Sequence, residues 1–245
     1  MPMTQQAAPD IPRCADEVRT VLEMMGDMRA YHRWLFDTAQ PYLRGRVCEV
    51  GGGTGNITQY LIGYEDVVVI EPEPLSRRLL EERFAGFSNV TIVGLPLERC
   101  PCEHVVPGSF DSLLSVNVLE HIEDHLAAVR KMTTLVRPQG LVIAIVPALN
   151  ALLGELDHAA GHYRRYSRGS LTRLFEQAGL TVVRARYFNA IGALGWWVNS
   201  RIRGCSRMSQ AYYQKCERAV PLVRFFDHLC PIPLGQSLLI VGQRP

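Results

Sequence analysis

The sequence lacks a strong charge of either sign, a long apolar run and a recognisable export signal. Its 245 residues carry 26 basic and 24 acidic side chains, a net charge of +2, which is not the basic signature of a nucleic-acid binder. No apolar run reaches the length of about 18–20 residues that a membrane-spanning helix needs. The first residues, MPMTQQAAPDIPRCADEV, lack the basic-then-apolar order of a signal peptide. We therefore expect a cytoplasmic globular protein with no transmembrane segment and no nucleic-acid partner.

The sequence also lacks the usual metal-binding motifs. Its seven cysteines are an odd number, which favours free thiols over a disulfide framework. Cys100 and Cys102, with His104 close by, do not have the spacing of the common zinc pairs. Some histidines stand four residues apart, but the H-E-x-x-H motif is absent. We expect no metal.

Short apolar runs alternate with amphipathic stretches along most of the chain. The runs are apolar almost throughout, as in parallel strands that are buried on both faces. This order predicts an α/β fold with a doubly wound, mostly parallel seven-stranded sheet and helices on both faces. The expected strands are 46–50, 66–71, 89–94, 110–118, 141–147, 180–188 and 236–244. The expected helices of this region are about 55–63, 74–84, 119–135 and 170–178.

The remaining helical stretches predict a four-part organisation. An amphipathic pattern near the N-terminus indicates a helical lid, and a second helical stretch interrupts the core before its last strand. A long polar connection, residues 148–169, is typical of a functional loop or an inserted element. The expected parts are a lid at 1–42, a core at 43–188, a helical cap insert at 189–236 and the last core strand at 237–245.

Four glycines fall within five positions in VCEVGGGTGNIT, residues 47–58. Glycine inside a regular element is destabilising by about 0.5–1 kcal/mol relative to alanine, so the backbone here must be approached closely. Ligands of doubly wound sheets bind at the carboxyl ends of strands, against the free N–H groups of the next helix. The dinucleotide motif G-x-G-x-x-G does not close, because position 56 is Asn and position 58 is Thr. This disfavours a nicotinamide enzyme.

Residues 49–55 instead form the pattern acidic-x-Gly-x-Gly-x-Gly, which resembles the class I methyltransferases that use S-adenosylmethionine. Three further segments resemble that family in the same order: DVVVIE, which ends at Glu71, FDSLLSVNVLEHIEDH, and VRPQG, in which Gln139 replaces a glycine. Together they cover roughly residues 28–147. The resemblance implies S-adenosylmethionine as cofactor and S-adenosylhomocysteine as product.

The resemblance also implies which residues hold the cofactor. Glu49 and the glycine turn would meet the methionine part, and Glu71 would accept the ribose hydroxyls. Leu95 stands where the family often has Asp, so the adenine would meet backbone and apolar groups, with Glu98 as a second polar candidate. The expected set is Tyr31, Trp34, Glu49, Gly51, Gly53, Gly55, Glu71, Pro72, Leu95 and Asn117. For Trp34, packing in the core is an equally good interpretation.

Two histidine-rich stretches could meet the methyl acceptor. His121 and His125 lie four residues apart, and we expect His121 to line the acceptor site and His125 to be exposed. The second stretch, LDHAAGHYRRYSRGS at residues 156–170, follows the fifth strand on the ligand side. Its alternative is a solvated loop whose arginines meet surface acids. The expected catalytic residues are His121, His162 and Tyr166, and the expected substrate-binding residues are His158, Tyr163, Arg164 and Arg165.

Together these patterns predict a methyltransferase that acts on oxygen or nitrogen of a small acceptor, such as a specialised metabolite or a sugar-like compound. Two other classes stay open: a peptide or protein N-methyltransferase, and a non-enzymatic binding protein that retains the fold. The basic stretch within 189–236 has two interpretations. It is either a packed insert with a solvated basic face, or a contact with an anionic membrane surface or lipid-linked substrate.

Overall fold

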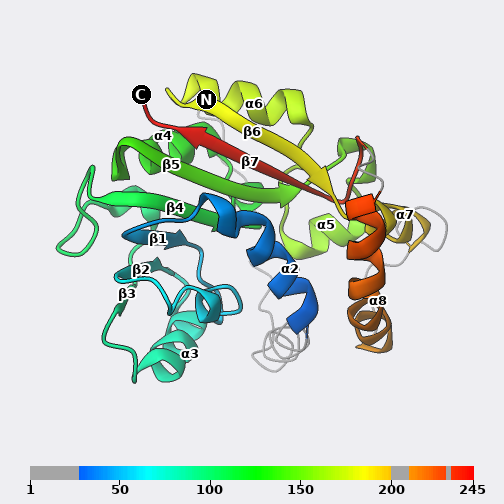
Figure 1. Ribbon diagram of the computed structural model, residues 1–245, viewed down its shortest axis with the longest axis horizontal. Coiled ribbons are helices and arrows are strands. Elements are labelled where there is room, and N and C mark those ends of the chain that lie inside the picture. Colours follow the sequence, from blue (N-terminus) through cyan, green and yellow to red (C-terminus); the bar gives the residue numbers. More distant parts are fainter. Residues whose placement is uncertain (1–27, 200–209, 230–232) are drawn as a thin grey trace, which may run out of the picture.

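A computed structural model describes residues 28–199, 210–229 and 233–245. Its centre is one seven-stranded sheet with the order β3-β2-β1-β4-β5-β7-β6 (Figure 1). All seven expected strands are present, so the predicted sheet is confirmed. The strands are β1 (Val47–Val50), β2 (Val67–Ile70), β3 (Val90–Val93), β4 (Phe110–Val116), β5 (Val136–Pro147), β6 (Thr181–Phe188) and β7 (Ser237–Gln243).

The sheet is parallel except for β7, which runs antiparallel between β5 and β6. Strand β1 pairs in parallel with β2 on one side and with β4 on the other. Both β1 and β2 are buried along their whole length, which explains their continuous apolar sequences. The strand order reverses between β1 and β4, and a doubly wound sheet binds its ligands at such a reversal.

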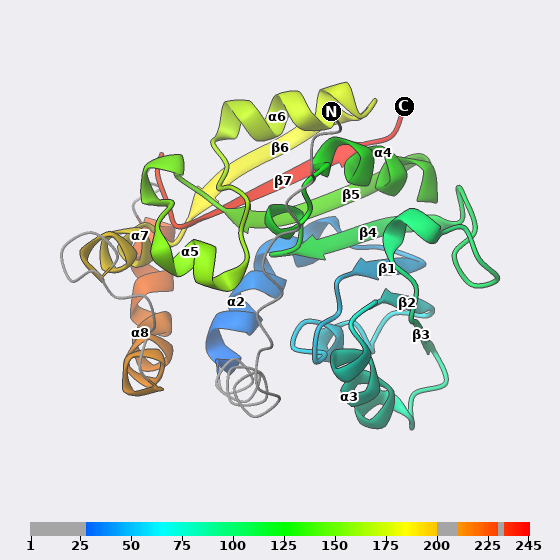
Figure 2. The same cartoon turned by 180° about the vertical axis from the view of Figure 1, so that it is seen from behind.

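Helices cover both faces of this sheet (Figures 1 and 2). One apolar core joins the sheet to α4 and α6, and a second joins it to α2, α3 and one residue of α8. The helices are α2 (Arg29–Ala39), α3 (Pro74–Phe84), α4 (His125–Leu135), α5 (Glu155–Ala160), α6 (Arg168–Gln177), α7 (Ala190–Trp197) and α8 (Gln210–Leu229). The described residues also form five short 3-10 turns: η1 (Gln40–Tyr42), η2 (Thr58–Tyr60), η3 (Leu97–Arg99), η4 (Leu119–His121) and η5 (Asn150–Leu152).

Two expected helices are wrong in extent. Instead of a helix over 55–63, the structure has only the turn η2, because Gly55 has φ +85°, a conformation that no right-handed helix contains. The helix expected from 119 is split into η4 and α4. Asp124 ends the gap between them, since its carboxylate accepts the N–H of Ala127 at 2.9 Å and caps α4.

Two acidic residues of α8 tie this helix to α2 and to α7. Helix α8 lies beside α2 (Figures 1 and 2), and Glu217 of α8 accepts the N–H groups of Ala30 and Tyr31 at the start of α2. A carboxylate at a helix N-terminus is stabilising because the helix dipole is positive there. Asp227 of α8 accepts the N–H of Ala190, which begins α7, at 3.2 Å. The boundaries of the lid and the cap remain a prediction, and residues 1–27 of the expected lid lie outside the described part.

Two expectations from composition can be compared with the described residues. Within them, no helix combines the length and the apolar character needed to cross a membrane. The cysteines among them, Cys48, Cys100, Cys102 and Cys216, are all free thiols.

Gln139 adopts a conformation that favours glycine. It lies early in β5, is exposed, and has φ +64°, which costs a residue with a side chain about 1–2 kcal/mol. We expect Gln139→Gly to raise the free energy of unfolding by about 1 kcal/mol, or the melting temperature by about 2–4 °C for a chain of this size. Gln139→Ala, the control, keeps the strain and should give no such gain. Equal melting temperatures for the two variants would contradict this origin of the effect.

Candidate active site

The glycines of the turn after β1, residues 51–55, serve two different purposes. Gly51, Gly53 and Gly55 have φ values of +80°, +54° and +85°, so all three need glycine's conformational freedom. A Cβ on Gly51 would lie 2.3 Å from Val118, and one on Gly55 would lie 2.4 Å from the Phe84 ring. A Cβ on Gly53 would meet nothing within 4 Å. Two of these glycines therefore allow close packing, and Gly53 exposes its backbone to open space where a ligand can lie.

Glu71, at the end of β2, holds this turn in place. It is 7% exposed and accepts the N–H of Gly53 at 2.7 Å and that of Glu73 at 2.9 Å. Burial raises the pKa of Glu71, and the two backbone N–H groups lower it in part. A carboxylate offers about four lone-pair positions, so Glu71 keeps acceptor capacity for the hydroxyl groups of a ribose.

Glu49 lies beneath the turn, in β1. It is 2% exposed, and its carboxylate accepts the hydroxyl of Thr58 at 2.6 Å. Burial raises the pKa of Glu49 to about 8, against the lowering effect of Thr58 and with a further increase from Glu71. A positively charged ligand group beside Glu49 would favour its ionised form. The turn and its two glutamates therefore fit the amino acid and ribose parts of S-adenosylmethionine.

The other expected cofactor residues lie around the same edge. Asn117 follows β4 with φ +54°, and its N–H donates to Ile145 at 2.8 Å. Leu95 is partly buried against the core, whereas Pro72 and Glu98 are exposed. Their contacts with the cofactor remain predictions.

The two aromatic residues expected from α2 differ in their surroundings. Trp34 is 4% exposed and packs edge-on against Phe188, with ring centroids 5.6 Å apart, which gives it a core role. Tyr31 is partly buried. Burial raises the pKa of Tyr31, the Ser237 hydroxyl lowers it, and the charges of Arg165 and Glu120 also act on it. Tyr31 therefore faces the group of side chains that follows β4.

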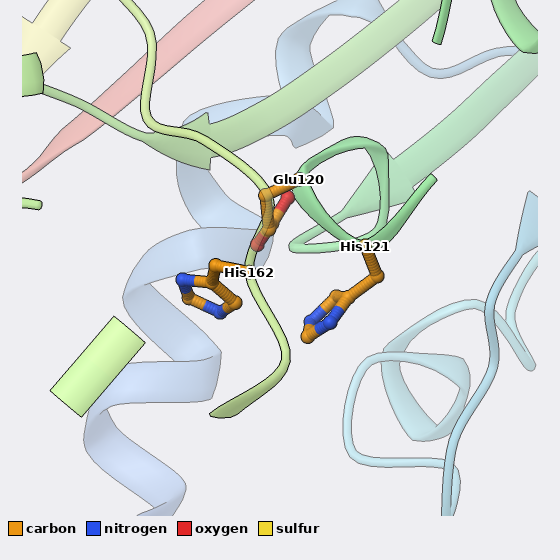
Figure 3. Close-up of side chains that lie close together, drawn as sticks. All are labelled: Glu120, His121 and His162. Atoms are coloured by element: carbon orange, nitrogen blue, oxygen red, sulfur yellow. The ribbon is translucent and has the colours of Figure 1, made fainter. Parts of the chain in front are cut away.

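That group contains Glu120 and His121 of η4 and His162 from the segment after α5 (Figure 3). The rings of His121 and His162 meet edge-on, with centroids 4.7 Å apart. Glu120 is fully buried, and neither of its carboxylate oxygens has a hydrogen-bond partner in the described structure. Burial raises the pKa of Glu120 to about 8, although the N–H of its own residue, which lies near the carboxylate without the geometry of a hydrogen bond, and the charge of Arg165 lower it.

Asp157 of α5 orients this group. Its buried carboxylate lies 2.9 Å from Nδ1 of His162 and accepts Nε of Arg165 at 2.8 Å. Burial raises the pKa of Asp157, but the hydrogen bonds from His162 and Arg165 outweigh it and lower the pKa below its ordinary value. Because an ionised carboxylate can only accept, Nδ1 of His162 carries the proton. Nε2 of the neutral imidazole is then the nitrogen free to accept a proton or bind a ligand.

The two arginines of this segment act as anchors. Arg165 is 4% exposed, donates to the carbonyl of Ala148 at 3.0 Å, and lies 4.7 Å over the Trp196 ring. Arg164 donates to the carbonyls of Ile122 and Glu123, both at 2.9 Å. The segment is thus fastened over η4, and the alternative of a solvated loop with arginines meeting surface acids is wrong. Substrate binding by either arginine remains a prediction.

The remaining expected acceptor residues are placed differently. Tyr166 is 2% exposed, donates its hydroxyl proton to the carbonyl of Leu119 at 3.0 Å, and lies 2.9 Å from His125. Burial raises the pKa of Tyr166, so its hydroxyl is committed to the interior. His125 is partly buried, and the expectation that it is exposed is wrong. His158 and Tyr163 are exposed, and their roles remain predictions.

Sequence reasoning missed Glu120 and Asp157. Glu120 directly precedes the expected His121, and Asp157 lies in the quoted stretch 156–170, so both were in view. What distinguishes these two residues is their burial, which no sequence pattern shows. Glu120 is covered by a distant segment, in which the N–H of Tyr163 donates to the carbonyl of Glu120 at 2.9 Å.

Comparisons with known proteins agree with the resemblance to methyltransferases. A family model described as a methyltransferase domain matches residues 18–185, well over half of the chain. A ubiquinone/menaquinone biosynthesis C-methyltransferase of Coxiella burnetii is 26% identical over 157 residues, and the match spans 58% of this chain but only 61% of that relative. A ubiquinone biosynthesis O-methyltransferase of Methylobacterium nodulans is 27% identical, over 85% of this chain and 98% of the relative.

A solved structure extends the likeness to the fold. Phosphoethanolamine N-methyltransferase 2 of Haemonchus contortus, in complex with phosphomonomethylethanolamine and S-adenosylhomocysteine, superposes with a TM-score of 0.64 at 12% identity. The match covers 94% of this chain and 58% of that one. At this identity the likeness is one of fold.

The buried Glu49 predicts a specific pH dependence of stability. The folded chain keeps its proton up to about pH 8, whereas the unfolded chain releases it near 4.5. The stability that protonated Glu49 contributes is therefore fully present below pH 4.5. It is lost as the pH rises towards 8, by up to about 1.4 kcal/mol per pH unit. We expect Glu49→Gln to flatten the slope of the free energy of unfolding, measured by urea titration from pH 5 to 8. The exposed Glu103→Gln is the control, and equal slopes in the two variants would refute the assignment.

Proposed function

The chain belongs to the class I S-adenosylmethionine-dependent methyltransferase family, and we propose that it transfers the methyl group to a hydroxyl oxygen of a small-molecule acceptor. The observation that carries this proposal is the grouping of Glu120 and His121, on the turn η4 after β4, with His162 from the segment after α5. This group borders the crevice between β1 and β4, where the cofactor would bind.

The residues around the glycine turn would hold the cofactor. Gly53 leaves space against its backbone, Glu71 would accept the ribose hydroxyls, and Glu49 would face the amino acid part. When bound, S-adenosylmethionine supplies a methyl group on a positively charged sulfur. The chain's part is to hold the acceptor oxygen in line with that methyl carbon, and such positioning alone can contribute much of the acceleration.

The reaction requires a place for one proton. The lone pair of the acceptor oxygen forms the new C–O bond, and the C–S bond breaks with its electron pair going to sulfur, which leaves neutral S-adenosylhomocysteine. The hydroxyl proton leaves towards the group of Glu120, His121 and His162. A neutral amine could attack without prior loss of a proton, so a group of proton acceptors at this place favours a hydroxyl acceptor.

The acceptor we propose is a phenolic compound. The hydroxyl of a phenol has a pKa of about 10, so imidazole and carboxylate side chains can accept its proton. A sugar hydroxyl is much less acidic. The name of the Methylobacterium relative, an O-methyltransferase of ubiquinone biosynthesis, supports the same choice. A peptide or protein acceptor is the second candidate, and the same experiment distinguishes it from a phenol.

The experiment begins with calorimetric titration of the full chain with S-adenosylmethionine and, separately, S-adenosylhomocysteine. We expect both to bind in the micromolar range. Labelled methyl donor is then offered with small phenols, amines, sugars and peptides, and we expect label on phenols. Label on peptides alone would replace the proposed acceptor class, and no binding of either cofactor form would reject the enzymatic function.

Gly53 provides a sharper test, because the chain contains a matched control. Gly53 and Gly108 both have positive φ, +54° and +68°, and in both cases a Cβ would meet nothing within 4 Å. Gly53→Val and Gly108→Val should therefore cost similar stability. Only Gly53→Val places a side chain over the glycine turn, and we expect it to weaken S-adenosylhomocysteine binding at least ~10-fold in calorimetry. Equal affinity in the two variants would place the cofactor elsewhere.

A further inference from the structure

We propose that Glu120, His121 and His162 bind a divalent first-row transition-metal cation, and that this cation holds the acceptor hydroxyl. The role of the cation rests on the proposed function, whereas its binding can be tested separately. The sequence predicted no metal, so this site revises that expectation.

The three side chains already have the arrangement of a ligand set. One ligand atom from each residue lies within 4.8 Å of the other two. Figure 3 shows the carboxylate of Glu120 between the two imidazoles, with Glu120 and His121 on the turn after β4 and His162 on the segment that crosses it. Two histidines and one carboxylate that approach from one side leave coordination positions open for other ligands.

The buried carboxylate of Glu120 lacks a partner. Both of its oxygens are inaccessible to water and without a hydrogen bond in the described structure, and an unsatisfied buried polar group is destabilising. The charge of Arg165 acts on Glu120, but its guanidinium is committed to Asp157 at 2.8 Å and to the carbonyl of Ala148.

His162 is prepared as a metal ligand by its hydrogen bond to Asp157. The contact joins Nδ1 to the carboxylate at 2.9 Å, which fixes the orientation of the ring and leaves Nε2 as the donor atom. Metal-binding histidines almost always have such a partner on their second nitrogen. Asp157 is fixed in turn by Arg165 and by the N–H of Gly154 at 3.1 Å. These contacts hold the carboxylate that orients the His162 ring.

The donor atoms indicate which cations fit. Two imidazoles and one carboxylate suit zinc, manganese, iron or cobalt better than calcium or magnesium, which prefer oxygen ligands. A cation held by these side chains would polarise the acceptor hydroxyl and lower its pKa. With the cation bound, the three side chains would act as ligands, and the hydroxyl proton would go to water instead of to them. The cation would thus bring a phenolic hydroxyl to its reactive form and fix its position.

The first test is binding of Co²⁺ and Zn²⁺ by the full chain after treatment with a chelator, by calorimetry and by the visible absorption of bound Co²⁺. We expect one equivalent to bind, and at least ~10-fold weaker binding in Glu120→Gln, His162→Ala and His121→Ala. His121 is exposed, so the last variant should fold normally. His104→Ala and Glu103→Gln, exposed residues on another turn, are the controls. The absence of stoichiometric binding, or equal binding in all variants, would overturn the site.

The second test separates the cation from the cofactor. S-adenosylhomocysteine should bind His121→Ala and the wild-type chain equally. Methyl transfer to a phenol should cease in chelator and return with Mn²⁺ or Zn²⁺. Full methyl transfer in chelator would overturn the role of the cation. Stoichiometric cation binding without any binding of S-adenosylhomocysteine would leave the site standing and reject the proposed function instead.

Discussion

The site depends on the parallel pairing of β1 with β2 on one side and with β4 on the other. Because parallel strands end at the same edge, three glutamates from within or just after these strands gather there: Glu49, Glu71 and Glu120. Each is at most 7% exposed, and burial raises the pKa of each. Burying three carboxyl groups at one edge opposes folding, and this edge is therefore suited to cationic ligands. A ligand with an ammonium and a sulfonium group, as S-adenosylmethionine has, matches that demand.

The three glutamates differ in how far the chain itself satisfies them. Glu71 receives two backbone N–H groups and Glu49 receives the Thr58 hydroxyl, whereas neither oxygen of Glu120 receives a hydrogen bond in the described structure. The first two are thus already held by the glycine turn, where we propose that the cofactor binds. Glu120 retains its full capacity for a ligand, and this difference separates the cofactor side of the edge from the acceptor side.

The strands and the glycine turn could be predicted from the sequence because their determinants are local. Continuous apolar runs identified the strands, Pro74 marked the first residue of α3, and the glycine pattern over 47–58 located the turn. The acceptor side could not be predicted in the same way. The burial of Glu120 follows from a segment about 40 residues further along, and the hydroxyl of Tyr166 turns inward because Leu119 and His125 meet it. Such contacts are made by tertiary packing, so no local spacing reveals them.

This difference also explains why resemblance identifies a cofactor more readily than an acceptor. The residues around the glycine turn come from one continuous stretch of the core, between β1 and the end of β4. The proposed acceptor side is assembled from distant parts: Tyr31 of α2, the turn η4, the segment after α5, and Ser237 of β7. Helix α2 is in turn held by Glu217 of α8. A change in the insert can therefore shift Tyr31 and alter the acceptor site while the glycine turn and its glutamates stay as they are. Within one fold, the acceptor can then diverge while the cofactor is retained.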